Sequence, residues 1–165
     1  MYETETEVSM PWVRADGGYA TSGHKAKRGN EIVTAIAIAT RQSYGTIYRE
    51  LYTRQIEFVR RTRSKRIKAY ADKNGAGIAS VGVWPEVYKP YLVELGWEWT
   101  PVMGIGTGTT MHLTYDEVPD KPVLLLSISK SMCAVVNGVV HAPQDPSRDG
   151  TRAVYGYWTP PSAES

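Results

Sequence analysis

The segment Asn30-Glu31-Ile32-Val33-Thr34-Ala35-Ile36-Ala37-Ile38-Ala39-Thr40 predicts the helix on which the rest of the fold is built. Asn30 is a preferred N-cap residue, and Glu31 in the first turn would meet the positive end of the helix dipole. Apolar side chains occupy almost every side of this helix, which is typical of a helix buried within a domain. We therefore expect it to be the central helix of the protein.

Two further helices are predicted downstream of this segment. The first starts near Ser43 and continues to about Asp72, where the glycine-rich run 74–77 breaks the helical pattern. The second begins at Pro85, a favoured residue for the first turn of a helix, and ends at Gly96, a favoured residue just after the last turn.

Short strands are predicted after the helices, at residues 97–99, 111–115, 123–129, 132–136, 139–141 and 152–158. The dipeptide Asn137-Gly138 is a strong signal for a tight hairpin between two of them. Helices followed by antiparallel strands are typical of the α+β class. The sequence therefore predicts an α+β domain, with helices first and the buried central helix packed on a C-terminal antiparallel sheet.

The chain divides into three predicted parts. Residues 1–29 are polar and rich in glycine, without apolar periodicity, and are expected to form an N-terminal arm outside the core. Residues 30–158 are expected to form the domain, and residues 159–165 a C-terminal tail. A length of 165 residues, with 42% hydrophobic and 22% charged residues, is ordinary for a single globular domain.

Composition argues against several classes of function. The longest apolar run, 123–126, is far shorter than the roughly 18 residues of a membrane span, so no membrane partner is expected. The acidic N-terminal residues do not match a secretion signal. A lone Cys133 excludes an internal disulfide and a multi-cysteine metal site, and His24, His112 and His141 lack metal-ligand spacing. We expect the protein to bind no metal and no cofactor. We also expect it to function in a reducing cytoplasm or on a particle assembled there.

Several short segments combine into a pattern that extends from the central helix to the last strand. They are Asn30 to Thr40, Gly82-Val83-Trp84, Tyr91-Leu92, Leu95-Gly96-Trp97, Trp99-Thr100-Pro101 to Ile105-Gly106, His112-Leu113, Ala134 to His141, Asp145 to Arg152, and Val154 to Trp158. In combination they resemble a family of small phage-encoded papain-like domains. The resemblance covers about residues 30–158, is most specific near its C-terminal end, and implies a papain-like fold.

The chemistry of that family depends on three catalytic residues. A cysteine stands at the N-terminus of the central helix, a histidine on a neighbouring strand takes its proton, and an Asp or Asn orients the imidazole. The resemblance places these residues at Glu31, Ser131 and Ala142, so all three are replaced. A carboxylate is a weak nucleophile in acyl transfer, and Glu31 is instead expected to stabilise the helix by about 0.3–1 kcal/mol. The resemblance therefore implies a pseudoenzyme, an inactive relative of papain-like cysteine hydrolases.

Three hypotheses about function follow from the replaced positions. The first is a non-catalytic bacteriophage protein with a structural or assembly role, found in the virion or host cytoplasm and bound to other phage structural subunits or to itself. The alternative is an infection-stage binding protein that captures a host factor or ligand in the degenerate cleft. A third is an active cysteine hydrolase that uses Cys133 or an unrecognised residue, which requires a shifted alignment.

A basic stretch between residues 54 and 73 provides a candidate contact surface. The stretch begins with Arg54 and ends with Lys73, and the candidate surface within it consists of Arg60, Arg61, Arg63, Lys65, Arg66 and Lys68. Such a cluster would contact the phosphates of a nucleic acid, while Tyr52 or Tyr70 stacks on its bases. The same cluster would also suit a solvated helix face or a contact with an acidic protein, and the sequence leaves these interpretations open.

Overall fold

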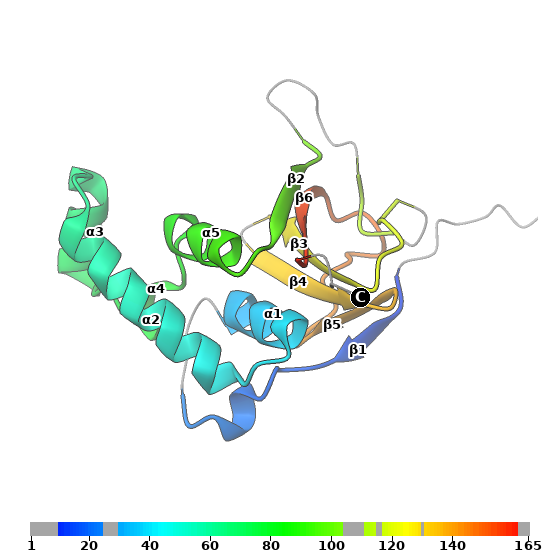
Figure 1. Ribbon diagram of the computed structural model, residues 1–165, viewed down its shortest axis with the longest axis horizontal. Helices are drawn as coiled ribbons and strands as arrows, with labels where there is room; N and C mark the ends of the chain where they lie inside the picture. Colours follow the sequence, from blue (N-terminus) through cyan, green and yellow to red (C-terminus); the bar gives the residue numbers. More distant parts are fainter. Residues whose placement is uncertain (1–9, 25–29, 104–110, 115–116, 130, 162–165) are drawn as a thin grey trace, which may run out of the picture.

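The computed structural model describes residues 10–24, 30–103, 111–114, 117–129 and 131–161. Helix α1 (Asn30–Thr40) packs on the middle of a six-stranded sheet, against strands β3 (Val123–Ile128) and β4 (Ser131–Val136) (Figure 1). Six consecutive α1 residues, 32–37, are buried. The sheet covers one side of α1 and helix α2 (Tyr44–Arg61) another, which explains why its apolar residues are not confined to a single stripe.

The remaining elements complete a mixed α+β structure. They are β1 (Trp12–Arg14), the 3-10 helix η1 (Tyr19–Thr21), α3 (Lys65–Asn74), α4 (Ile78–Val81), α5 (Pro85–Glu94), β2 (Glu98–Pro101), β5 (Val139–Ala142) and β6 (Val154–Thr159). The strand order in the sheet is β1-β5-β4-β3-β6-β2. The predicted α+β class is confirmed. Of the described helices, none is long and apolar enough to span a bilayer.

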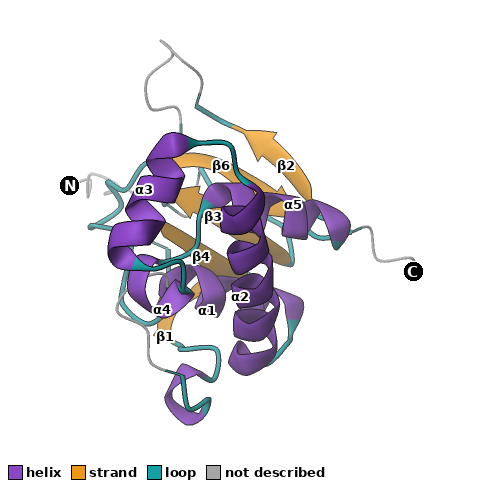
Figure 2. Ribbon diagram, turned by 90° about the vertical axis from the view of Figure 1, so that its left-hand side faces the viewer, coloured by secondary structure: helices purple, strands orange, loops and turns teal. Residues whose placement is uncertain are grey.

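Two hydrophobic clusters lie on opposite faces of the sheet. The first contains the buried residues of α1, α2 and α5 together with Leu125, Met132 and Ala134 from the strands. The second contains strand residues whose side chains point to the opposite face, including Leu126 and Cys133, because successive residues of a strand face opposite sides of the sheet. Met10 and loop residues pack against them. Figure 1 shows the helices beside one face of the sheet, and Figure 2 looks onto that face with the helices in front of the strands. The opposite face is covered by loops and by the N-terminal segment.

The hairpin between β4 and β5 forms where the sequence predicts it. Asn137 and Gly138 have φ angles of 50° and 78°, the left-handed values that a two-residue type I′ turn requires. The ladder pairs Val136 with Val139 and Ala134 with His141. Because side chains alternate between faces, this register determines which residues of the two strands meet the helices.

The N-terminal segment is part of the domain in its described residues, and the prediction of an arm outside the core is wrong for 10–24. Strand β1 pairs with β5 in parallel, with Trp12 opposite Val140, so the sheet is mixed and not purely antiparallel. The Trp12 indole Nε1 donates to the carbonyl oxygen of Ala142 at 3.0 Å, and Met10 is buried in the second cluster. Residues 1–9 and 25–29 of the predicted arm lie outside the described residues.

The single helix predicted from Ser43 to Asp72 is two helices. After Arg61 the backbone becomes extended at Thr62, and the Ser64 hydroxyl accepts a hydrogen bond from the Ile67 amide as the N-cap of α3. Ser and Thr side chains compete for backbone groups, so they favour such an interruption. The predicted helix from Pro85 forms as α5, and Gly96 follows it with φ 90°.

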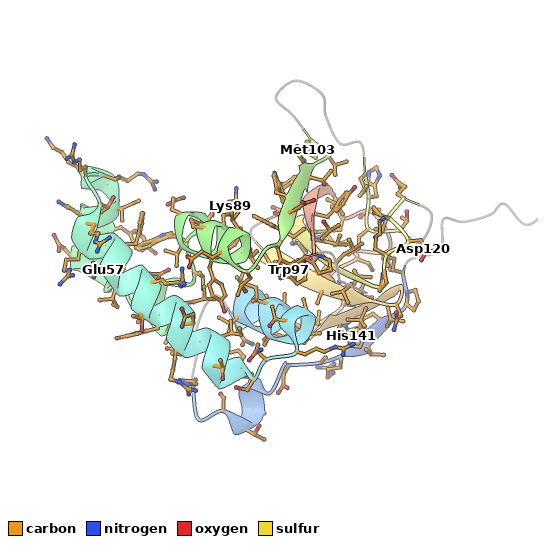
Figure 3. The ribbon with its side chains drawn as sticks, in the orientation of Figure 1. Glu57, Lys89, Trp97, Met103, Asp120 and His141 are labelled. Carbon is orange, nitrogen blue, oxygen red and sulfur yellow. The ribbon has the colours of Figure 1, made fainter. Side chains whose placement is uncertain are left out.

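Smaller differences concern the strands. In its described part the predicted strand at 111–115 is reduced to isolated bridge residues, His112, which pairs with Ala153, and Thr114, while residues 115–116 lie outside the description. Strand β6 reaches Thr159, which the sequence assigned to a tail. Of that tail, residues 162–165 lie outside the described part of the chain. Trp97 lies between α5 and the sheet and is buried in the first cluster (Figure 3).

Candidate functional site

A pocket of about 540 Å³ lies where α1 and β4 begin and where β5 ends. Its lining comprises Asn30, Glu31, Ile128, Ser129, Ser131, Met132, Cys133, Ala142, Pro143, Gln144, Asp145, Pro146, Arg148 and Arg152. The three positions that the resemblance assigns to catalysis, Glu31, Ser131 and Ala142, are therefore brought together on one pocket. They come from segments about 100 residues apart in the chain.

The three positions do not lie on the same face of the sheet. Ser131 pairs with Ile128, and both Ile128 and Ala142 belong to the cluster on the face away from α1. Glu31 instead lies in the first turn of α1, on the helical face, and its side chain is exposed. No hydrogen bond joins these three residues within the described part of the chain. The pocket extends across the end of the sheet, and the three side chains do not form a contacting triad.

The lone thiol is a poor nucleophile in this environment. Cys133 lies in the middle of β4, opposite Leu126, with only 1% of its surface exposed. Burial raises the pKa of its thiol to about 12, and the positive charge of Arg152 offsets this only in part. Reactive cysteines lie in partly exposed, electropositive sites where the pKa is lowered. The thiol of Cys133 therefore stays protonated at neutral pH and packs as a small apolar group.

Two arginines on the pocket were not singled out from the sequence. Arg152 donates from Nη2 to the carbonyl oxygen of Ser129 at 2.8 Å, while its buried Nε has no hydrogen-bond partner among the described residues. Partial burial lowers the pKa of its guanidinium, and the nearby charge of Arg148 adds to this effect. A guanidinium presents a rigid fork of donors suited to carboxylate and phosphate oxygens. Arg152 therefore lines the pocket with a side chain held by Ser129, and its buried Nε is a donor without a partner among the described residues.

The loop that carries these arginines has a defined backbone conformation. The Asp145 carboxylate accepts a hydrogen bond from the Ser147 amide at 3.0 Å, and the Ser147 carbonyl accepts one from the Arg152 amide at 3.0 Å. Arg148 and Asp149 both adopt left-handed φ angles, 52° and 57°. A residue other than glycine seldom adopts this conformation, so the run 145–152 is a tight turn held by its own hydrogen bonds.

The histidines lie apart from one another. The His112 ring is within 3.2 Å of Glu117, His24 stacks on Tyr48 with ring centroids 4.0 Å apart, and His141 belongs to β5 (Figure 3). Among the residues that the structure describes, no group of three His, Cys, Asp or Glu side chains could hold a metal ion.

The predicted basic surface is divided between two helices. Arg60 and Arg61 end α2, and both pair with Glu57, whose carboxyl pKa is lowered chiefly by the Arg60 hydrogen bond. Of the other four members, Arg63 lies in the turn before α3, and Lys65, Arg66 and Lys68 lie in the first half of α3. All four are exposed and form no ion pair with a described residue. Figure 3 shows Glu57 on α2 at the end of the molecule far from His141. None of these residues lines the pocket at α1.

Comparison with known proteins adds no relative. No protein family model matches the chain, and neither a curated protein nor a solved structure does.

Proposed function

We propose that this chain is a non-catalytic relative of papain-like cysteine hydrolases that acts through binding. One observation supports this most strongly. The pocket at the start of α1 is lined by the positions of all three expected catalytic residues, yet these are Glu31, Ser131 and Ala142, and the thiol beside them, Cys133, is buried. An acyl-transfer enzyme needs an accessible nucleophile within reach of a base. The described pocket offers two carboxylates, two arginines and hydroxyl groups in place of that arrangement.

The role that we propose is structural, in the assembly of a phage particle, with other phage subunits or further copies as partners. Support for this comes from β2, which forms an edge of the sheet and whose four residues are all exposed. An exposed edge strand has unpaired backbone groups that can pair with another chain. Trp99 on this strand keeps 37% of its surface exposed, and tryptophan is enriched in protein interfaces. Residues 10–24 pack on their own domain, so we assign the contact to β2.

Chemical crosslinking of the full-length protein during its native infection tests this role. Lys89 is suited to an amine-reactive crosslinker, because its Nζ lies 5.7 Å from the centre of the Trp99 ring beside β2. We expect stoichiometric crosslinks from Lys89 to a phage structural protein or to a second copy. The Lys89→Arg variant keeps the charge and should lose those crosslinks only. Crosslinks confined to other lysines, or an absence of any stoichiometric partner, would contradict the proposed role.

A second candidate function is favoured by the Nε of Arg152, which has no hydrogen-bond partner among the described residues. This donor, together with Arg148, suits the oxyanion of a ligand held in the degenerate cleft. Titration with inorganic phosphate and with acetate, followed through the Arg152 Nε–H signal by NMR, tests it. We expect a saturable shift that weakens in Arg148→Ala, whereas an unchanged signal would reject ligand binding at this pair.

A further inference from the structure

Positive charge is concentrated at the junction of α2 and α3. Seven of the fourteen residues 60–73 are Lys or Arg, and Asp72 is the only acidic residue among them. The segment therefore carries a formal charge of +6 in a chain whose net charge is only +2, so the rest of the chain is net negative. A charge distribution this uneven produces a local positive field, which attracts a polyanion to one part of the surface.

The helix α3 presents this charge at the periphery of the molecule. It lies at the end of the helical layer, away from the sheet (Figures 1 and 2). Ile67 is its only buried residue, so most of its circumference is exposed to solvent. Because the Ser64 cap starts a new helix after Arg61, α3 is separate from the end of α2, where Glu57 pairs with two arginines.

Helical spacing aligns an aromatic ring between two cations on α3. Arg66, Tyr70 and Lys73 are related by i, i+4 and i+7, so they follow one another along a single side of the helix. All three are exposed, and Tyr70 keeps 40% of its surface accessible. An edge contact with Trp84, with centroids 6.3 Å apart, restricts the orientation of the Tyr70 ring. An oriented, exposed ring flanked by cations is suited to stack on a planar group that carries negative charge beside it.

We propose that this side of α3, with the preceding turn, binds single-stranded nucleic acid. Arg66 and Lys73 contact phosphates on either side of a base that stacks on Tyr70, and Arg63 and Lys65 extend the phosphate track toward the start of the helix. A free base face is exposed in a single strand and hidden in a duplex, so the aromatic ring favours the single-stranded form. A contact with an acidic protein would use the same cations but has no need for Tyr70. This site shares no residue with the pocket at α1 and does not depend on the function proposed for that pocket.

Fluorescence anisotropy of the full-length protein with labelled single-stranded oligonucleotides, oligo(dT) and oligo(U), tests the proposal at several salt concentrations. We expect binding whose affinity falls steeply with salt. The double variant Arg66→Gln/Lys73→Gln should weaken binding and reduce the slope of log K against log salt by about 1.4, as expected for two lost phosphate contacts. Tyr70→Ala should weaken binding by about 5-fold or more with the salt slope unchanged, while Tyr70→Phe, which keeps the ring, should bind normally.

A matched control removes two positive charges elsewhere. Arg41→Gln/Lys121→Gln changes the net charge by the same amount at exposed sites outside α3 and should leave the affinity unchanged. Circular dichroism of each variant verifies that the fold is kept. An affinity that falls equally in the control pair would overturn the proposal, as would binding that is insensitive to Tyr70→Ala. Equal affinity for duplex DNA, or for polyglutamate of matched length, would also reject the single-stranded assignment.

Discussion

Gln55 on α2 accepts a hydrogen bond through its Oε1 from the backbone amide of Trp84, at 3.1 Å. The same side-chain amide donates from Nε2 to the carbonyl oxygens of Ala76 and Gly82, at 2.9 and 2.8 Å. Gln55 is fully buried, so it connects α2 to both ends of the short α4 segment and to the start of α5. A single polar side chain thus satisfies three backbone groups, of which the Gly82 carbonyl is in a fully buried hydrogen bond and the other two are in partly buried ones.

Replacing Gln55 should therefore destabilise the fold. We expect Gln55→Ala to lower the free energy of unfolding by about 2–4 kcal/mol, because each buried group left without a partner costs about 1–3 kcal/mol. Urea denaturation followed by circular dichroism measures this difference. Gln42→Ala, at an exposed position just after α1, is the matched control and should change stability by less than about 0.5 kcal/mol. Equal stability of the two variants would show that the hydrogen bonds of Gln55 do not contribute to the free energy of unfolding.

The packing of Met10 provides a test of whether the N-terminal segment belongs to the core. Met10 is only 5% exposed and closes the second hydrophobic cluster, while Val13 on β1 is 44% exposed. We expect Met10→Ala to cost about 2–5 kcal/mol, the usual range for removing a buried methionine side chain. Val13→Ala on the same segment should cost far less. If thermal or urea unfolding shows no difference between the two variants, the segment does not contribute to the core.

Local features of the sequence predicted the elements that depend on local interactions. The hairpin at Asn137-Gly138 and the buried helix α1 each have a signal within a dozen residues, and both form. Strand β1 has three residues and pairs with β5 more than 120 residues away, so its own sequence contains no periodicity that could reveal it. The break between α2 and α3 was missed because the apolar pattern continues across it, although the Ser64 cap was a visible signal.

The candidate site was predictable only in part. The resemblance named Glu31, Ser131 and Ala142, and the fold brings all three to one pocket. Their distribution over two faces depends on the β3–β4 register, which pairs Ser131 with Ile128 and cannot be derived from spacing alone. The role of Arg152 was missed for a similar reason. Its side chain donates a hydrogen bond to the carbonyl oxygen of Ser129, just after β3, and this contact depends on the fold and not on the spacing in the sequence.

Position 156 on β6 is predicted to require glycine for stability, because the Trp99 ring lies against it and leaves no room for a side chain. A Cβ atom at position 156 would lie 2.4 Å from the Trp99 ring and 2.8 Å from the Thr100 carbonyl oxygen. Gly156→Ala should therefore destabilise the protein by about 1–3 kcal/mol through overpacking of the β2–β6 pair. The control is Gly45→Ala on α2, where a Cβ meets the flexible end of Arg49 at 3.2 Å and the His24 ring at an ordinary contact distance of 3.8 Å, and helix propensity favours alanine. A Gly156→Ala chain as stable as the wild type would show that β2 moves freely away from β6.

The thiol of Cys133 supplies a test of the proposal that the chain is non-catalytic. We expect iodoacetamide at neutral pH to leave the folded protein unlabelled over a period in which the urea-unfolded chain reacts fully, because the folded thiol is buried and protonated. A single cysteine introduced as Ser80→Cys in a Cys133→Ala chain, at an exposed position, should react readily and serves as the control. Fast stoichiometric labelling of Cys133 in the folded state would instead support a cysteine hydrolase.

The same burial predicts how Cys133 affects stability at alkaline pH. Its pKa is raised from 9.0 to about 12 in the folded state, so folding favours the protonated thiol. The stability that the buried, protonated Cys133 thiol contributes is fully present below pH 9 and is lost as the pH rises toward 12. Over that range the thiol of the unfolded chain releases its proton, which stabilises the unfolded state relative to the folded one. The difference in unfolding free energy between the wild type and Cys133→Ala should therefore shrink over that range. Because the buried tyrosines titrate in both chains, their effect cancels in the comparison, and a difference that stays constant from pH 8 to 11 would place the thiol in contact with solvent.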